Sequence, residues 1–141
     1  MSLKTYTCSC HCGAVRYDAE IDLAQGTIKC NCSICTKARA WLVFTSGQNV
    51  RLAPGAEAAT TEYQWTPPGK PHPFIHYHFC KTCGVRVFGR ADHPKFGGLF
   101  YAVPVNVIDG LDADELAATP INYVDGRNDL FEQRPADIRN L

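Results

Sequence analysis

The chain has 141 residues, a length that suits one domain, 1–141, with a hydrophobic core. Its 14 Lys and Arg residues balance its 14 Asp and Glu residues, so the formal net charge is zero when His is neutral. This balance gives no electrostatic reason to expect a nucleic acid or an anionic membrane as a partner. No apolar run is long enough for a signal peptide or a membrane span, so we expect a cytoplasmic protein with no membrane partner.

Strand patterns recur along the chain. Residues 15–21 alternate apolar with polar side chains, which is the period of a half-buried strand. Short runs rich in β-branched and aromatic residues, bounded by turn-forming residues, predict further strands. These runs are 27–29, 41–45, 50–52, 60–65, 74–79, 85–88, 99–105 and 121–124.

Proline and glycine mark the breaks between strands. Residues 66–73 contain four prolines and predict an exposed loop, because proline is excluded from central strands. Residues 91–98, with one proline and two glycines, also predict a loop. Pro104 restricts its strand to an edge or a bulge.

A helix signal is present at one place. Asp112, with Glu115 three residues later, predicts the start of a short helix that ends by residue 118, before Pro120. Residues 134–141 read as a polar tail. Many short strands and at most one short helix predict an all-β domain.

Seven of the eight cysteines lie close together in three groups. The groups are Cys10 with Cys12; Cys30 with Cys32 and Cys35; and Cys80 with Cys83. Zinc prefers four tetrahedral ligands drawn from Cys and His, and closely spaced cysteines aim two sulfurs at one ion. Disulfides are rare where thiols are kept reduced, and no secretory signal accompanies these cysteines. The spacing therefore favours metal binding over disulfides.

The cysteine count predicts two kinds of metal site. The two pairs together make one closed site, here called the four-cysteine group, and Gly84 lets the backbone turn tightly after Cys83. The other three cysteines, within 30–35, are here called the three-cysteine cluster and make a site that lacks one protein ligand. An open coordination position distinguishes a catalytic zinc from a structural one.

Three segments, in this order, resemble the glutathione-dependent formaldehyde-activating enzyme family, whose domain is shared with centromere protein V. The segments are CHCGAVRY at 10–17, CNCSIC at 30–35 and FCKTCGVRVF at 79–88. The resemblance covers roughly residues 8–110. It implies an all-β fold of several short coiled antiparallel sheets cross-linked by zinc, and an enzyme that condenses formaldehyde with glutathione to S-hydroxymethylglutathione.

The resemblance also implies roles for the cysteines and a cofactor content of two zinc ions per chain. The structural zinc would be held by Cys10, Cys12, Cys80 and Cys83, and the catalytic zinc by Cys30, Cys32 and Cys35. Two positions depart from the family pattern. Cys8 stands where glycine is usual, and Thr36 stands where a basic residue commonly follows the cluster. Both lie beside the sites, so they bear on the substrate more than on the fold.

The chemistry of a three-thiolate site favours a thiol substrate. Three thiolates leave a bound zinc with a formal charge of minus one, which makes it a weak Lewis acid, better suited to holding a thiolate than to activating water. Lys37 and Arg39 are candidates to bind a glutathione carboxylate or to offset the negative charge of the cluster, with an ordinary solvated face as the alternative. Asn31 and Ser33 are candidates to donate hydrogen bonds to cluster sulfur.

Three other residues allow more than one interpretation. Cys8 is predicted to be a small buried residue, with a fourth ligand to the cluster or a redox partner as alternatives. His76 and His78 share one side of a strand, and a half-exposed face is favoured over proton transfer or metal binding.

The sequence therefore predicts a zinc-dependent carbon–sulfur lyase whose partners are glutathione, or another small thiol, and an aldehyde. The alternative is a non-catalytic binding module cross-linked by zinc, and a weaker one is a redox-sensing thiol protein. The neutral charge disfavours a chromatin partner for the module. Short exposed edge strands leave a homodimer open.

Overall fold

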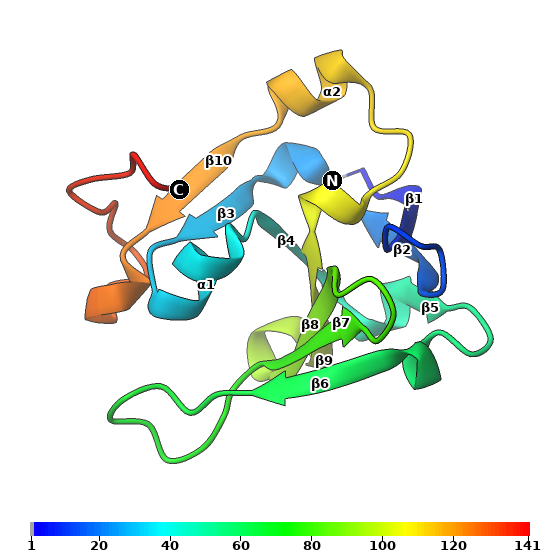
Figure 1. Ribbon diagram of the computed structural model, residues 1–141. Helices are drawn as coiled ribbons and strands as arrows, with labels where there is room; N and C mark the ends of the chain where they lie inside the picture. The colour runs from blue at the N-terminus through cyan, green and yellow to red at the C-terminus, as the bar shows by residue number, and fades with distance from the viewer. Residues whose placement is uncertain (1) are drawn as a thin grey trace.

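Two β-sheets, of seven and three strands, organise the chain in the computed structural model, which describes residues 2–141 (Figure 1). The strands are β1 (Lys4–Ser9), β2 (Arg16–Ile21), β3 (Thr27–Cys30), β4 (Leu42–Ser46), β5 (Val50–Leu52), β6 (Thr60–Gln64), β7 (His76–Cys80), β8 (Arg86–His93), β9 (Gly98–Pro104) and β10 (Ile121–Val124). The helices are α1 (Ser33–Ala38) and α2 (Ala113–Ala118). The larger sheet has the order β10-β3-β4-β9-β8-β7-β6, and the smaller one β1-β2-β5.

The predicted all-β class is confirmed, but the limit of one short helix is wrong because α1 is a second one. The predicted helix is α2, where the Asp112 side chain accepts from the Glu115 N–H as an N-cap. In contrast, α1 has no side-chain cap at Cys32 and contains no buried residue. A six-residue helix without a cap or an apolar face leaves no helical signal in the sequence.

The core lies between the two sheets. The alternation predicted for 15–21 is confirmed, since Tyr17, Ala19 and Ile21 are buried. The Tyr17 hydroxyl donates to the Val87 carbonyl at 2.6 Å, and its ring packs edge-on against Phe88. Burial of each large side chain stabilises the fold by about 1.5–3 kcal/mol. These contacts hold the small sheet against β8.

Strand β1 was not predicted. It pairs antiparallel with β2 over its full length, from Lys4 opposite Ile21 to Ser9 opposite Arg16. Half of its residues are exposed and only Tyr6 and Cys8 are buried, so its apolar content is too low to signal a strand. Its role is to deliver the chain to Cys10.

The second cysteine pair lies at a hairpin tip, as predicted. Strands β7 and β8 are antiparallel neighbours, and between them the Gly84 N–H donates to the Cys80 carbonyl at 2.9 Å. Gly84 has φ of 76°, a conformation that glycine adopts without strain. The turn therefore folds back beneath the two sulfurs.

The loop predicted over 91–98 is shorter than expected. Strand β8 continues to His93, because Ala91 pairs with Phe100 and His93 with Gly98 on β9. Only a single turn of 3-10 helix, Pro94–Phe96, and Gly97 separate the two strands.

Pro104 ends a central strand without breaking the sheet. Strand β9 pairs with β4 as far as Pro104, which lies opposite Leu42, but its pairing with β8 stops at Ala102. The prediction that Pro104 restricts its strand to an edge or a bulge is therefore wrong, because β9 is a central strand of the seven-stranded sheet. Proline is tolerated at its last residue because Pro104 has a paired strand on one side only.

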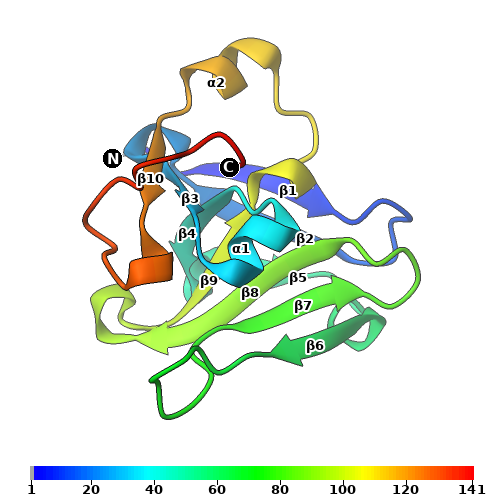
Figure 2. The same cartoon turned by 60° about the vertical axis from the view of Figure 1, so that its left-hand side comes forward.

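The C-terminal part of the chain returns to the first half. Strand β10 pairs with β3 in parallel, with Val124 opposite Cys30, as the single exception to the predicted antiparallel pairing in the described chain. Figure 2 shows the C-terminal segment beside β10 and α1. The predicted polar tail is not detached, because Arg39 Nη1 donates to the Asn140 carbonyl at 2.6 Å.

Across residues 2–141, no helix combines the length and apolar character of a membrane span.

Candidate functional site

The four-cysteine group joins the two sheets. Cys10 and Cys12 follow β1, while Cys80 and Cys83 lie at the β7–β8 tip, and their four sulfurs lie within 4.8 Å of one another. Cys12 Sγ is 3.7 Å from Cys10 Sγ and 3.6 Å from Cys80 Sγ. Tetrahedral zinc with bonds of about 2.3 Å separates its sulfur ligands by about 3.8 Å. The observed spacing fits a four-coordinate zinc.

Backbone N–H groups converge on these sulfurs. The Val15 N–H donates to Cys10 Sγ at 3.3 Å, and the Thr82 N–H donates to Cys80 Sγ at 3.3 Å. Backbone hydrogen bonds, from Val85 first, lower the pKa of Cys83 to about 6. Thiolates are the form that binds metal, so these backbone hydrogen bonds favour the ligand state of Cys80 and Cys83, whose pKa values are both lowered.

The three-cysteine cluster is formed where β3 passes into α1. Cys30 ends β3, Cys32 precedes α1 and Cys35 lies within it, and their sulfurs lie within 4.8 Å of one another. Hydrogen bonds from the other two thiols lower the pKa of Cys32 to about 3 and raise the pKa of Cys35. Without a cation, only Cys32 readily carries the negative charge. A bound cation would allow all three to ionise, which fits the cluster as a metal site.

Asn31 holds in place the loop that packs beside the three-cysteine cluster. The sequence predicts a different role for it, as a hydrogen-bond donor to cluster sulfur. Its amide Nδ2 donates to Asp125 Oδ1 at 2.8 Å, and its Oδ1 accepts from the Arg127 N–H at 2.9 Å. Arg127 Nε donates to the Asn31 carbonyl at 3.0 Å. The expected Asn31 bond to cluster sulfur is replaced by these contacts across the chain.

Gly126 brings the backbone directly against the cluster. A Cβ atom built on Gly126 would overlap the Cys30 sulfur and lie 3.0 Å from the Phe131 ring. Only glycine therefore fits at this position. Asp125, Gly126 and Arg127 were not identified from the sequence, because they lie more than 90 residues from Asn31 and Cys30, against which they pack, and carry no local metal signal.

A cavity of about 310 Å³ lies between the two cysteine groups. Cys35 of the cluster lines it on one side, and Gly84 and Val85, which follow Cys83, line it on another. Most of the remaining walls are apolar and come from α1, β4, β8 and β9. The other lining residues are Ala38, Ala40, Leu42, Tyr77, Arg86, Phe88, Gly89, Ala102, Pro104 and Asn106.

Tyr77 and Arg86 form the polar side of the cavity. The Arg86 guanidinium lies 4.4 Å from the centre of the Tyr77 ring. Burial raises the pKa of Tyr77, and the nearby ionisable thiols Cys35 and Cys32 raise it further. The phenol therefore stays protonated beside the cluster.

The predicted binding residues Lys37 and Arg39 lie outside this cavity. Neither is among its lining residues, and both are exposed. Arg39 ends α1 with φ of 54°, and its side chain reaches the Asn140 carbonyl. A role for them in glutathione binding remains a prediction.

Cys8 is buried, as predicted. None of its surface is exposed, and it belongs to neither group of converging sulfurs. Burial raises the pKa of its thiol to about 12. A raised pKa makes Cys8 a packing residue in this fold, since a protonated thiol is a poor ligand and a poor nucleophile.

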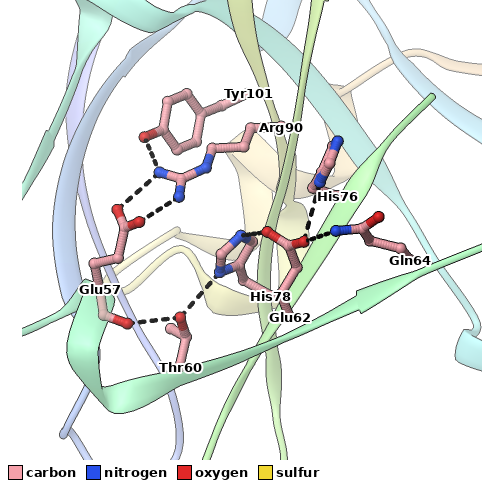
Figure 3. Close-up of polar contacts among 8 residues, drawn as sticks. All are labelled: Glu57, Thr60, Glu62, Gln64, His76, His78, Arg90 and Tyr101. Carbon is pink, nitrogen blue, oxygen red and sulfur yellow. Dashed lines mark hydrogen bonds and ion pairs between the residues drawn. The ribbon is translucent and has the colours of Figure 1, made fainter. Parts of the chain in front are cut away.

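The two strand histidines differ from each other. His76 is half-exposed, as predicted, and its Nδ1 lies 3.1 Å from Glu62 Oε2. The half-exposed prediction is wrong for His78, which is 4% exposed and stacks on Phe88. Its Nδ1 lies 2.9 Å from Thr60 Oγ1, and its Nε2 lies 3.2 Å from Glu62 Oε1 (Figure 3). Burial lowers the pKa of His78.

The same network continues to a neighbouring ion pair. Arg90 Nη1 donates to Glu57 Oε1 at 2.9 Å and to the Tyr101 hydroxyl at 3.2 Å (Figure 3). Thr60 also donates to the Glu57 carbonyl, at 2.8 Å. These side chains attach the edge strand β6 to β7, β8 and β9, which is a structural role.

Comparisons with known proteins agree with this arrangement. A crystal structure of a Rhodobacter sphaeroides protein, a structural genomics target, is 26% identical with a TM-score of 0.63, and the match covers 82% of this chain and 99% of that one. A family model described as "Glutathione-dependent formaldehyde-activating enzyme" matches residues 5–124, a range that contains both cysteine groups. The resemblance found in the sequence is thereby confirmed, and the chain belongs to the glutathione-dependent formaldehyde-activating enzyme family.

Proposed function

We propose that the chain is a zinc-dependent carbon–sulfur lyase that resembles S-(hydroxymethyl)glutathione synthase. It would join glutathione or a similar small thiol to formaldehyde or another small aldehyde, as one domain acting in the cytoplasm, where thiols stay reduced. Membership of the family supports a glutathione-related, formaldehyde-activating function. The observation that supports the finer proposal is that Cys35 of the three-cysteine cluster lines a cavity, whereas the four-cysteine group already has four ligands.

Two zinc ions per chain fit the two groups of sulfurs. Cys10, Cys12, Cys80 and Cys83 would hold a structural ion, and Cys30, Cys32 and Cys35 a catalytic one. A zinc held by three thiolates supplies an open position of weak Lewis acidity, which favours a substrate thiolate over water.

The residues of the chain position the reactants and exclude water. The thiol sulfur forms a bond to the aldehyde carbon, and the thiol proton moves to the aldehyde oxygen. The apolar walls from α1, β4 and β9 limit the access of water, and the small cavity holds the two reactants close together. Asn31 and Gly126 keep the loops around the cluster in place.

The test combines zinc content with an adduct assay. Cys30→Ser should lower the zinc content from two ions per chain to one and abolish adduct formation above the uncatalysed rate, as followed by NMR with labelled formaldehyde. Cys8→Ala is the matched control, because Cys8 lies outside both groups, and it should keep two zinc ions and the activity. Unchanged adduct formation in Cys30→Ser would favour the non-catalytic binding module.

A further inference from the structure

Arg86 is a cation without an acidic partner on the wall of the cavity. It begins β8, opposite Phe79 of β7, and lines the same cavity as Cys35. Within the described range 2–141, no Asp or Glu lies within ion-pair distance of its guanidinium, although Arg51, Arg90 and Arg139 each have such a partner. Its N–H donors are therefore available to a ligand.

The guanidinium is held in place by an aromatic ring. It lies 4.4 Å from the centre of the Tyr77 ring, a separation at which a cation is attracted to the ring face. Arg86 is thus orientated before any ligand arrives, which lowers the entropy lost on binding.

The remaining walls favour an anion at Arg86. No Asp or Glu lines the cavity, and its polar side chains other than Arg86 are Cys35, Tyr77 and Asn106. Guanidinium groups bind carboxylates through two parallel hydrogen bonds, which are stronger in a poorly solvated site. The volume of about 310 Å³ is at the low end for small-molecule sites, so it suits the reacting end of a thiol.

We propose that Arg86, held against Tyr77, binds a carboxylate of the thiol substrate and selects small carboxylated thiols over neutral thiols of the same size. This specificity rests on the proposed function, because it takes the three-cysteine cluster as the site for the thiol sulfur. It assigns the binding of the acidic group to the cavity wall instead of to the exposed Lys37 and Arg39.

The test compares two thiols that differ in one group. Binding of 3-mercaptopropionate and of 3-mercaptopropanol to the zinc-loaded protein is measured by titration calorimetry. The wild type should bind the carboxylate about 10- to 100-fold more tightly than the alcohol, and added salt should reduce that ratio. Arg86→Gln should lose the preference for the carboxylate and keep its affinity for the alcohol. Arg86→Lys should retain part of the preference for the carboxylate.

A second arginine serves as the matched control. Arg134 also stacks on a tyrosine, Tyr123, at 4.9 Å, but it lies beside β10 and outside this cavity. Arg134→Gln should therefore keep the full preference. All variants should retain two zinc ions per chain, which shows that the cysteine groups are intact.

The outcomes separate this inference from the proposed function. If adduct formation is catalysed but the wild type shows no preference, or if Arg86→Gln keeps the preference, the assignment of Arg86 is wrong and the proposed function stands. If Lys37→Gln abolishes the preference instead, the carboxylate lies at α1 and the assignment is also wrong. If neither thiol binds and no adduct forms, the proposed function fails and the specificity of Arg86 fails with it.

Discussion

At the scale of single residues, Gly126 controls the space beside the three-cysteine cluster. Its backbone lies so close to Cys30 that any side chain there would occupy the position of the sulfur. Steric overlap with a ligand atom is not easily relieved by a shift, because the Phe131 ring also lies 3.0 Å from the same Cβ position. The geometry of the site thus depends on a residue that has no functional group.

Gly126→Ala should lower the zinc content from two ions per chain to one, because the added methyl group displaces Cys30 Sγ. Metal analysis of the purified protein measures this. Gly110→Ala is the matched control, since Gly110 has φ of 68° but nothing within 4 Å of its Cβ position. It should lose about 1 kcal/mol of stability through backbone strain and keep both zinc ions. Two zinc ions in Gly126→Ala would contradict the expected overlap.

Asn31→Ala should weaken the second metal site and change the titration of Asp125. Hydrogen bonds from Asn128 and Asn31 lower the pKa of Asp125, so loss of Asn31 should raise that pKa toward the usual value for aspartate. The pKa of Asp125 is lower in the folded chain than in the unfolded chain. Ionised Asp125 therefore stabilises the fold at pH values above its unfolded pKa, and this stabilisation is lost as the pH falls through its folded pKa. Carboxyl NMR titration measures this shift.

Asn31→Ala should also lower zinc affinity at the three-cysteine cluster about 10- to 100-fold, as expected when a residue that orientates metal ligands is removed. Competition with a chelator measures that affinity. Ser33→Ala is the control, because Ser33 is adjacent to Cys32 but exposed, and it should behave as the wild type. An unchanged pKa of Asp125 would show that Asn31 is not the donor that matters.

At the scale of elements, the edge strand β6 is attached to the sheet by side chains as well as by its backbone. Thr60, the first residue of β6, is buried and contacts both the His78 ring and the Glu57 carbonyl. Thr61, its neighbour, is exposed. The contrast between the two threonines allows the contribution of the buried network to be measured.

Thr60→Val should lower the free energy of unfolding by about 1–3 kcal/mol, because the isosteric change leaves the buried Nδ1 of His78 without its partner and removes the hydroxyl bond to the Glu57 carbonyl. Thr61→Val should change it by less than about 0.5 kcal/mol. Denaturant unfolding of the zinc-loaded protein gives both values. Equal effects of the two substitutions would show that the network adds nothing to the pairing of β6 with β7.

The elements that were predicted are those with local signals. The hairpin at Cys80–Gly84 and the strands around it follow from alternation, β-branched residues and a glycine turn, all within about ten residues. Helix α1 was missed because six residues are too few for periodicity, and its ends are set by contacts of Cys32 and Arg39. The burial of His78 was missed because it depends on Phe88 and Thr60 from neighbouring strands.

At the scale of the whole molecule, the candidate site also divides into parts that have a local sequence signal and parts that have none. Both sets of cysteines could be predicted because metal-ligand spacing is itself a local pattern. Their surroundings could not, because Asn31 and Asp125 are 94 residues apart and meet only through the parallel pairing of β3 with β10. The cavity likewise needs walls from α1, β4, β8 and β9 at once.

Deletion of residues 125–141 should leave one zinc ion per chain. The matched range of the family ends at residue 124, so the deleted segment, which contains Gly126 and Arg127, lies beyond it. The four-cysteine group makes no hydrogen bond to that segment within the described residues and should keep its ion. Deletion of 134–141 alone should keep both ions, because Asp125, Gly126 and Arg127 remain. Metal analysis of the two truncated proteins distinguishes these outcomes, and two zinc ions in the longer deletion would contradict the role of the segment.

The parallel pairing of β3 with β10 also sets an order of assembly. Cys30, Cys32 and Cys35 are synthesised before the strand and loop that cover them, since Asn31 and Asp125 are 94 residues apart. Contacts between such distant residues form slowly, since a long loop must close first. The nascent chain therefore carries three exposed thiols until β10 and the loop at Gly126 emerge, and up to that point the reaction of these thiols with oxidants or with the wrong metal competes with completion of the site.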